Sequence, residues 1–226
     1  MREGGHIPIE QTVHIPQDIV SLCVQWSAGL DNLTENASRI SYMKQKLPDL
    51  IADRALIRGI LNNIAAGASY PDIHYAGMFD SEIILYRDPN RLFSLRIYLW
   101  DALEYDPVHD HNSWGVIGPA LGDLEVINYS REDDGSRKNH ARLAECGRKL
   151  VLQGDTCSVL PLDPGIHRTG NPNDRPIVQV GVYGAKLTDR NYVNTYDLVS
   201  GKISPLFAPP VKKRVVACKV LSFIEE

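Results

Sequence analysis

The sequence predicts a mainly β fold, a small antiparallel barrel or sandwich that follows an N-terminal helical segment. Apolar residues recur at helical spacing over about the first third of the chain. From about residue 83 onward, short stretches of alternating apolar and polar residues follow one another, separated by turn-forming sequences. We therefore expect a helical segment over residues 1–80 that packs on a barrel over residues 81–226.

The N-terminal segment is expected to contain a first helix over residues 17–26 and a second over residues 32–46. Pro48 has no amide hydrogen and is favoured in the first turn of a helix, so a third helix is expected to open there. The apolar stripe of this third helix consists of Ile51, Leu56, Ile60 and Ile64 and ends near Gly67.

The barrel is predicted from a series of short strands. Over residues 93–100, Phe, Leu, Ile and Leu alternate with Ser, Arg, Tyr and Trp, which is the period of a strand. Further strands are expected over residues 116–117, 125–129, 141–145, 157–160, 177–183 and 214–223. Turn-forming sequences such as Asp163-Pro164-Gly165 lie between them. Many short strands at regular spacing are typical of an antiparallel sandwich or barrel.

Composition is that of an ordinary globular domain of 226 residues, 43% hydrophobic and 23% charged. The net charge of -4 provides no positive surface for nucleic acid or an anionic membrane. No apolar run approaches a membrane span, and the N-terminus lacks the pattern of a signal peptide. The four cysteines are scattered, which fits reduced thiols. We therefore expect a cytoplasmic protein without a nucleic-acid or membrane partner.

His109, His111 and His167 form the candidate metal site. On a β-strand, residues i and i+2 point to the same face, so His109 and His111 can bind one ion together. A third imidazole from a distant strand, that of His167, closes one side of the coordination sphere and leaves the opposite side open for chemistry. Three neutral imidazoles suit a first-row divalent metal, and by the usual affinity order they also accept nickel, zinc or copper.

The residues around these histidines resemble the two sequence motifs of the cupin superfamily. The first motif is His109-x-His111 followed by Gly122, and the second is Gly154…Pro161…Gly165-Ile166-His167…Asn171. The resemblance covers about residues 83–185 and implies a cupin double-stranded β-helix, a small barrel that holds a metal inside. Most cupins add a glutamate ligand four or five residues after the second histidine, where this chain has Gly115 and Val116.

A cupin with three histidines and no glutamate is similar to the cysteine dioxygenase family of thiol dioxygenases. The resemblance is carried by Pro107-Val108-His109-Asp110-His111-Asn112-Ser113-Trp114-Gly115, with Phe93…Leu99-Trp100 before it and Val182-Tyr183-Gly184 after it. It is closer to the bacterial branch that includes 3-mercaptopropionate dioxygenases. It implies Fe(II) held by the three histidines and a reaction in which O2 oxidises a small thiol, such as cysteine or 3-mercaptopropionate, to its sulfinate. Three neutral imidazoles leave the ion its full charge, which suits binding of a thiolate and O2.

Tyr183 is the candidate catalytic residue. By strand alternation Gln179, Gly181 and Tyr183 share one face, which is expected to look into the site, while the valines between them pack outward under the helices. The resemblance implies a Ser-x-His-x-Tyr relay at these positions, so Gln179 replaces its serine and Gly181 its histidine. Three arrangements stay open: Tyr183 acts without a histidine partner, a water fills the space over Gly181, or the cavity takes a larger substrate. The cysteine that some family members crosslink to the tyrosine falls at Val116.

A substrate carboxylate is expected to bind an arginine, because the planar guanidinium matches its two oxygens. Arg190 lies about where the bacterial enzymes have theirs, and Arg87 lies near the position used by the animal enzymes. Trp114 and Trp100 are expected to wall the barrel. The predicted substrate-binding residues are therefore Arg190, Arg87, Gln179 and Trp114, with Arg96 as a further candidate.

Two other functions stay compatible with the sequence. One is a cupin oxygenase with a different reaction, such as oxygenation of a carbon centre, on a different substrate that can be larger, and the missing relay histidine at Gly181 keeps this alternative open. The other is a cupin that binds a metal or ligand without turnover. The sequence indicates neither the identity of the thiol nor the oligomeric state.

Overall fold

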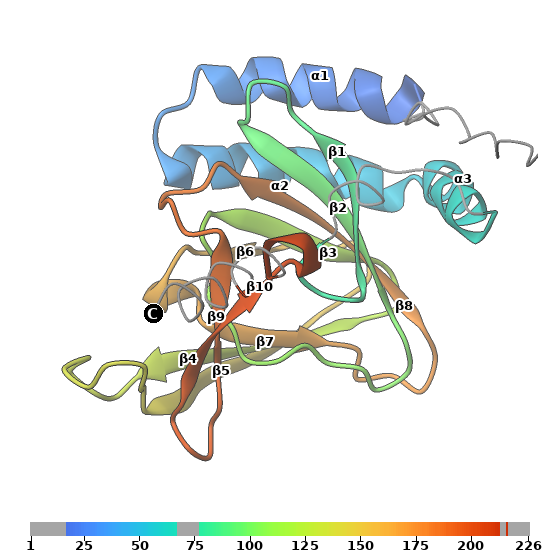
Figure 1. Ribbon diagram of the computed structural model, residues 1–226. Coiled ribbons are helices and arrows are strands. Elements are labelled where there is room, and N and C mark those ends of the chain that lie inside the picture. The colour runs from blue at the N-terminus through green and yellow to red at the C-terminus, as the bar shows by residue number, and fades with distance from the viewer. Residues whose placement is uncertain (1–16, 67–76, 213–215, 217–226) are drawn as a thin grey trace, which may run out of the picture.

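The structure, a computed structural model, describes residues 17–66 and 77–212 and the single residue Val216 (Figure 1). The chain begins with the helices α1 (Gln17–Asp31), α2 (Asn36–Ala52) and α3 (Arg54–Ala65). No helix in these described ranges is long and apolar enough to cross a membrane.

The rest of the described chain is built mainly from strands that pair antiparallel. They are β1 (Glu82–Arg87), β2 (Phe93–Trp100), β3 (Gly115–Leu121), β4 (Leu124–Arg131), β5 (Leu143–Val151), β6 (Cys157–Val159), β7 (His167–Gly170), β8 (Ile177–Gly184), β9 (Tyr192–Tyr196) and β10 (Ile203–Phe207). A 3-10 helix, η1 (Asp163–Gly165), precedes β7. The prediction of a mainly β fold with an N-terminal helical segment is confirmed.

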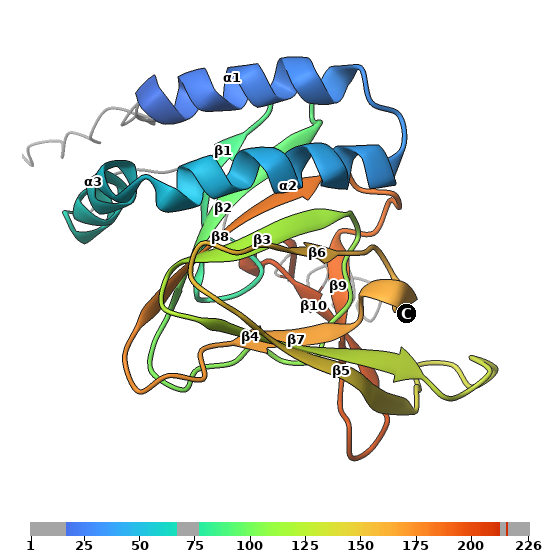
Figure 2. The same cartoon turned by 180° about the vertical axis from the view of Figure 1, so that it is seen from behind.

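The strands form two main sheets whose inner faces pack together. The larger sheet has the order β1-β2-β8-β3-β6, the smaller one has the order β5-β4-β7, and β9 and β10 form a hairpin. Figures 1 and 2 show α1 and α2 across the larger sheet, with β4, β5 and β7 on the opposite side of the molecule. Tyr98, Ile117 and Tyr183 of the larger sheet meet Val126 and Val151 of the smaller one in a single buried cluster. This cluster is the barrel interior.

The central strand β8 contributes to two cores at once. Val178, Val180 and Val182 pack in the cluster that contains Leu47 of α2 and other helix residues. Tyr183 lies on the opposite face of the same strand, in the barrel interior. The predicted alternation along this strand is confirmed. Burial of each valine stabilises the contact with the helices by about 1.5–3 kcal/mol.

The prediction of a helix start at Pro48 is wrong, because α2 runs through this residue to Ala52. The buried face of α2 continues across the proline, with Met43 and Leu47 before it and Leu50 after it. Packing of this face outweighs the backbone hydrogen bond that a proline cannot donate. The third helix begins after Asp53, whose side chain accepts a hydrogen bond of 2.9 Å from the amide of Leu56.

The sequence analysis gave no bounds for β1, β7, β9 or β10, although it placed His167 on a strand. β7 has only four residues, and β9 and β10 show no clean alternation of buried and exposed positions. The expected strand over residues 214–223 lies outside the described residues except for Val216, which is helical. Of the cysteines, Cys23, Cys146 and Cys157 are described and are free thiols.

The Asp53 cap generates a test of the fold. Asp53→Ala removes the acceptor for the Leu56 amide at the start of α3, so the free energy of unfolding should fall by about 1 kcal/mol. Urea unfolding followed by circular dichroism measures the change. Asp53→Asn keeps an accepting oxygen and serves as the matched control. A similar loss in both variants would show that the cap does not stabilise α3.

Candidate metal centre

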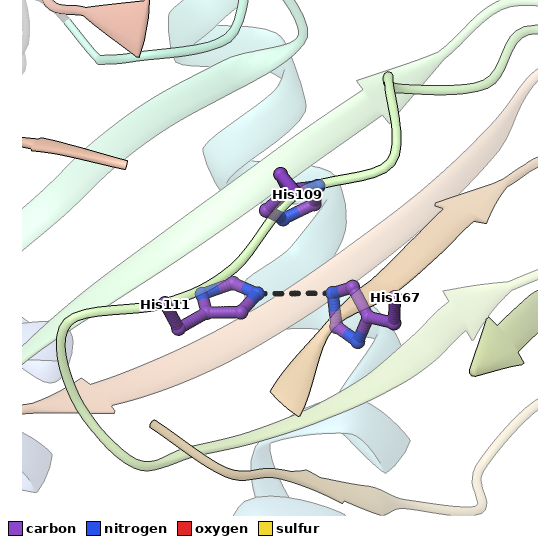
Figure 3. Close-up of side chains that lie close together, drawn as sticks. All are labelled: His109, His111 and His167. Carbon is purple, nitrogen blue, oxygen red and sulfur yellow. Dashed lines mark hydrogen bonds between the residues drawn. The ribbon is translucent and has the colours of Figure 1, made fainter. Parts of the chain in front are cut away.

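The three histidines converge inside the barrel from two segments that are far apart in the sequence (Figure 3). His109 and His111 lie in an irregular segment (residues 106–114) between β2 and β3, not on a regular strand as expected. His167 is the first residue of β7. The amide of His109 donates to the carbonyl of His167 over 2.9 Å, and the reverse bond measures 3.0 Å. This isolated antiparallel pair brings the rings together.

The geometry of the rings fits a shared ligand. One nitrogen from each ring lies within 4.8 Å of the others, and all three side chains are buried. The Nε2 atoms of His111 and His167 are 3.0 Å apart. Two nitrogens at right angles on one ion, with bonds of about 2.1 Å, are also about 3.0 Å apart. The group contains no carboxylate among the described residues, so the donor set fits a divalent metal with open positions.

The carbonyl of Pro107 orients His109. It lies 2.9 Å from Nδ1 of that ring, so Nδ1 carries the proton and Nε2 is left as the ligand atom. Asp106 lies behind the same nitrogen at 3.6 Å and accepts two hydrogen bonds from Thr169, a residue of β7. Both groups support the ligand ring without entering the centre.

Burial keeps two of the imidazoles neutral. Removal from water lowers the pKa of His111 and that of His167 well below the usual value, and the neighbouring ring of His109 lowers both further. For His111 the guanidinium of Arg96 acts in the same direction. Neutral imidazoles are the form that binds a metal.

Asp110 and Arg190 connect the segment that carries His109 and His111 to β9 and to the residues just before β9. The buried carboxylate of Asp110 accepts hydrogen bonds from Nη1 of Arg190 at 3.1 Å and from the amide of Asn194 at 2.8 Å. Nε of Arg190 donates to Asn112 over 2.9 Å. Arg190 Nη2 is buried and has no partner among the described residues. The guanidinium is thus largely engaged by the protein, and its role with a substrate carboxylate stays a prediction.

Tyr183 lies directly beside the metal site. Its ring stacks on that of His111, with centroids 5.6 Å apart and planes at 15°. A Cβ at position 181 would lie 2.9 Å from Cε2 of Tyr183 and 3.2 Å from Ile117. The space over Gly181 is therefore filled by the tyrosine ring itself. Burial raises the pKa of Tyr183, so its hydroxyl keeps its proton at neutral pH.

The predicted substrate-binding residues lie in different places. Gln179 accepts a hydrogen bond from Trp100 Nε1 at 3.0 Å inside the barrel. Trp114 packs instead in the core between the helices and the larger sheet. The structure does not bring the side chain of Trp114 to the histidines, because it packs with Val116 in the cluster on the helix side of the larger sheet. This corrects the expectation that it walls the site.

Arg87 and Arg96 line a cavity of about 950 Å³ together with Arg91 and Lys186, and the carboxylates of Asp88 and Asp189 belong to the same lining. Burial, and then the charges of Arg87 and Arg96, lower the pKa of Lys186. Arg96 also lies over the ring of Tyr183, 4.9 Å from its centroid. Arg87 stands at the exposed end of β1, and its contact with a substrate stays a prediction.

Sequence reasoning missed several buried polar residues near the site, namely Glu82, Tyr98, Asp106 and Asp110. Two of them carried a usable signal. Asp110 stands between the two histidines, where alternation turns it away from them. Glu82 is the acidic first residue of the otherwise apolar β1 stretch Glu82–Tyr86. The role of Tyr98 depends on strand pairing, which the sequence does not reveal.

No protein-family profile matches the sequence. Among solved structures, it is similar to a cupin 2 conserved barrel domain protein from Rhodopseudomonas palustris, with 16% identity and a TM-score of 0.37, over 53% of this chain and 68% of that one. A cupin 2 protein from Salinispora arenicola is 18% identical with a TM-score of 0.34, over 46% and 73%. The DMSP lyase DddQ from Ruegeria pomeroyi is 14% identical with a TM-score of 0.34, over 48% of each chain.

The lowered histidine pKa values predict that the metal-free protein loses stability in acid. Below about pH 6.5 the unfolded chain protonates His111 and His167 while the folded chain does not. The free energy of unfolding should therefore fall by up to about 1.4 kcal/mol per pH unit for each histidine. Urea titrations of the metal-free protein between about pH 7.5 and about pH 5.5 measure this loss. His111→Asn should show a smaller loss, and an unchanged one would contradict the assignment.

Metal binding should require all three imidazoles. His109→Ala removes one ligand and is expected to weaken Fe(II) or Co(II) binding by more than about 100-fold, since loss of a residue that only supports a ligand already costs about 10- to 100-fold. Equilibrium dialysis under anaerobic conditions measures the affinity. His140→Ala, a histidine outside the group, is the matched control. Equal affinity in both variants would place the metal elsewhere.

Proposed function

We propose that this chain is a cupin enzyme that uses Fe(II) and O2 to oxidise a small thiol, such as cysteine or 3-mercaptopropionate, to its sulfinate. The observation that carries the proposal is a buried centre of three imidazoles to which no carboxylate of the described residues is added, with Tyr183 stacked against one of them. The resemblance of residues 107–115 to the thiol dioxygenases agrees with this chemistry.

His109, His111 and His167 would hold the iron. When bound, Fe(II) supplies open coordination positions for a thiolate and O2 and the redox chemistry that joins oxygen to sulfur. The carbonyl of Pro107 and the carboxylate of Asp106 keep one ligand ring in its binding orientation. The three rings are buried, and a buried centre would limit side reactions with water.

Tyr183 would supply a neutral hydroxyl from a ring that stacks on His111. Since burial raises its pKa, it acts through a hydrogen bond and not as a phenolate. Arg96 lies over the ring and also lines the 950 Å³ cavity, but its guanidinium is paired with the carboxylate of Glu82. Arg87, Arg91 and Lys186 of the same cavity would attract an anionic group of a substrate, against the carboxylates of Asp88 and Asp189. The ring also fills the space over Gly181, which favours a small substrate over a larger one.

Oxygen uptake tests the proposed function. Protein reconstituted with Fe(II) should consume O2 with cysteine, with 3-mercaptopropionate or with a larger thiol, and mass spectrometry should find the sulfinate. Iron-loaded protein that consumes no O2 with any thiol would overturn the proposal and favour metal binding without turnover. Oxidation at a carbon atom would indicate the other kind of oxygenase.

The role of Tyr183 is tested separately. Tyr183→Phe keeps the ring that stacks on His111 and removes only the hydroxyl. Loss of one hydrogen bond to a charged ligand should lower kcat about 10- to 100-fold. Tyr42→Phe is the matched control. Tyr42 lies on α2 in the helical layer and is far from the three histidines in the sequence. An unchanged kcat in Tyr183→Phe would reduce this residue to a packing role.

A further inference from the structure

The ring of Tyr183 contacts two charged or ligand groups, the imidazole of His111 and the guanidinium of Arg96. Cζ of Arg96 lies over the ring, 4.9 Å from its centroid. The same ring stacks on His111 with centroids 5.6 Å apart. A cation over the face of an aromatic ring is attracted by the negative charge of that face. Arg96 of β2 therefore attracts the tyrosine that stacks on a candidate metal ligand.

The guanidinium of Arg96 is held firmly by other groups of the larger sheet. Its Nη1 pairs with Oε1 of Glu82, and its Nε donates to Oγ of Ser94 over 3.0 Å. Glu82 is only 4% exposed, and its Oε2 accepts a hydrogen bond of 2.6 Å from the amide of Met78. A buried carboxylate with several partners keeps a fixed position. The guanidinium over the tyrosine ring is therefore fixed as well.

The glycine at position 181 lets the ring of Tyr183 lie close to its own strand. A Cβ at this position would lie 2.9 Å from Cε2 of Tyr183 and 3.2 Å from Ile117. Arg96 is the cross-strand partner of Gly181 in the pairing of β2 with β8. Directly paired residues point to the same face of a sheet, and so do residues two apart on one strand. The side chain of Arg96 thus reaches the tyrosine ring from the neighbouring strand, on the face where position 181 has no side chain.

We propose that Arg96 is a positioning residue that holds the ring of Tyr183, and with it the phenolic hydroxyl, in a fixed place beside the metal centre. Glu82 and Ser94 hold the guanidinium, and the guanidinium attracts the face of the ring. This contact uses neither the proton nor the lone pairs of the hydroxyl, so both stay available to a group bound at the centre. The inference rests on the proposed role of Tyr183, but it does not depend on which substrate is oxidised.

A double-mutant cycle on the cobalt-loaded full chain tests the proposal, with azide as the probe. Azide binds open positions of Co(II) and changes its visible absorption, so its dissociation constant can be measured without turnover. Arg96→Met keeps a long side chain without the guanidinium and should weaken azide binding about 2- to 10-fold. Tyr183→Phe should weaken it at least as much. In the Tyr183→Phe background Arg96→Met should have no further effect, because no hydroxyl is left to misplace.

Arg148→Met is the matched control and should leave the dissociation constant unchanged. It also removes an arginine that is paired with glutamates, Glu125 and Glu145, but this arginine lies on β5 of the smaller sheet. An unchanged constant in Arg96→Met or in Tyr183→Phe would overturn the proposal. An equal loss from Arg96→Met in both backgrounds would overturn it too, because the charge of Arg96 would then attract azide directly.

A second variant covers the case in which Arg96→Met does not load cobalt. Arg96→Lys keeps a positive charge beside Glu82 but lacks the planar group that stacks on the ring, so a loss in the same range is expected. Azide binding needs no thiol and no O2. Failed thiol oxidation together with the expected azide cycle would therefore overturn the proposed function and leave the role of Arg96 standing.

Discussion

The backbone pairing of His109 with His167 is the constraint on which the metal centre depends. Its two hydrogen bonds, of 2.9 and 3.0 Å, join the segment before β3 to the first residue of β7. Both residues are buried, so these bonds do not compete with water. These bonds fix the separation of His109 and His167 through the backbone alone, whatever the orientation of the side chains. Pro107 and the Asp110–Arg190 pair then determine how the rings and the segment are turned.

Sequence reasoning succeeded where one residue type or one period carries the information. The three histidines could be chosen because imidazoles at His-x-His spacing with a distant third are unusual without a metal. The two faces of β8 could be assigned because alternation holds over its whole length, from Ile177 to Gly184. The break between helices and strands was equally readable, because the period of the apolar residues changes there.

The remaining features depend on contacts between distant segments. Pro48 is a helix-start signal by itself, yet the buried face of α2 carries the helix through it. Trp114 stands next to the histidine motif, but its side chain enters the core under the helices. Arg190 has the expected place in the sequence, and Asp110 engages it. The rings of Tyr98 and Tyr183 meet because β2 pairs with β8, and no local sequence pattern shows which strands are neighbours.

One face of β8 packs against the helices and the other faces the barrel interior, so the helices help to fix the register of β8 against β2. A slip of one residue between β8 and β2 would exchange inward and outward positions, so that Val182 would take the place of Tyr183. Such a slip would also push a tyrosine into the valine layer under α2. The helical layer therefore selects, through the volume it leaves for side chains, which chemical groups the barrel presents inside. Changes far from the histidines, on the inner face of α2, can in this way alter the composition of the site without touching it.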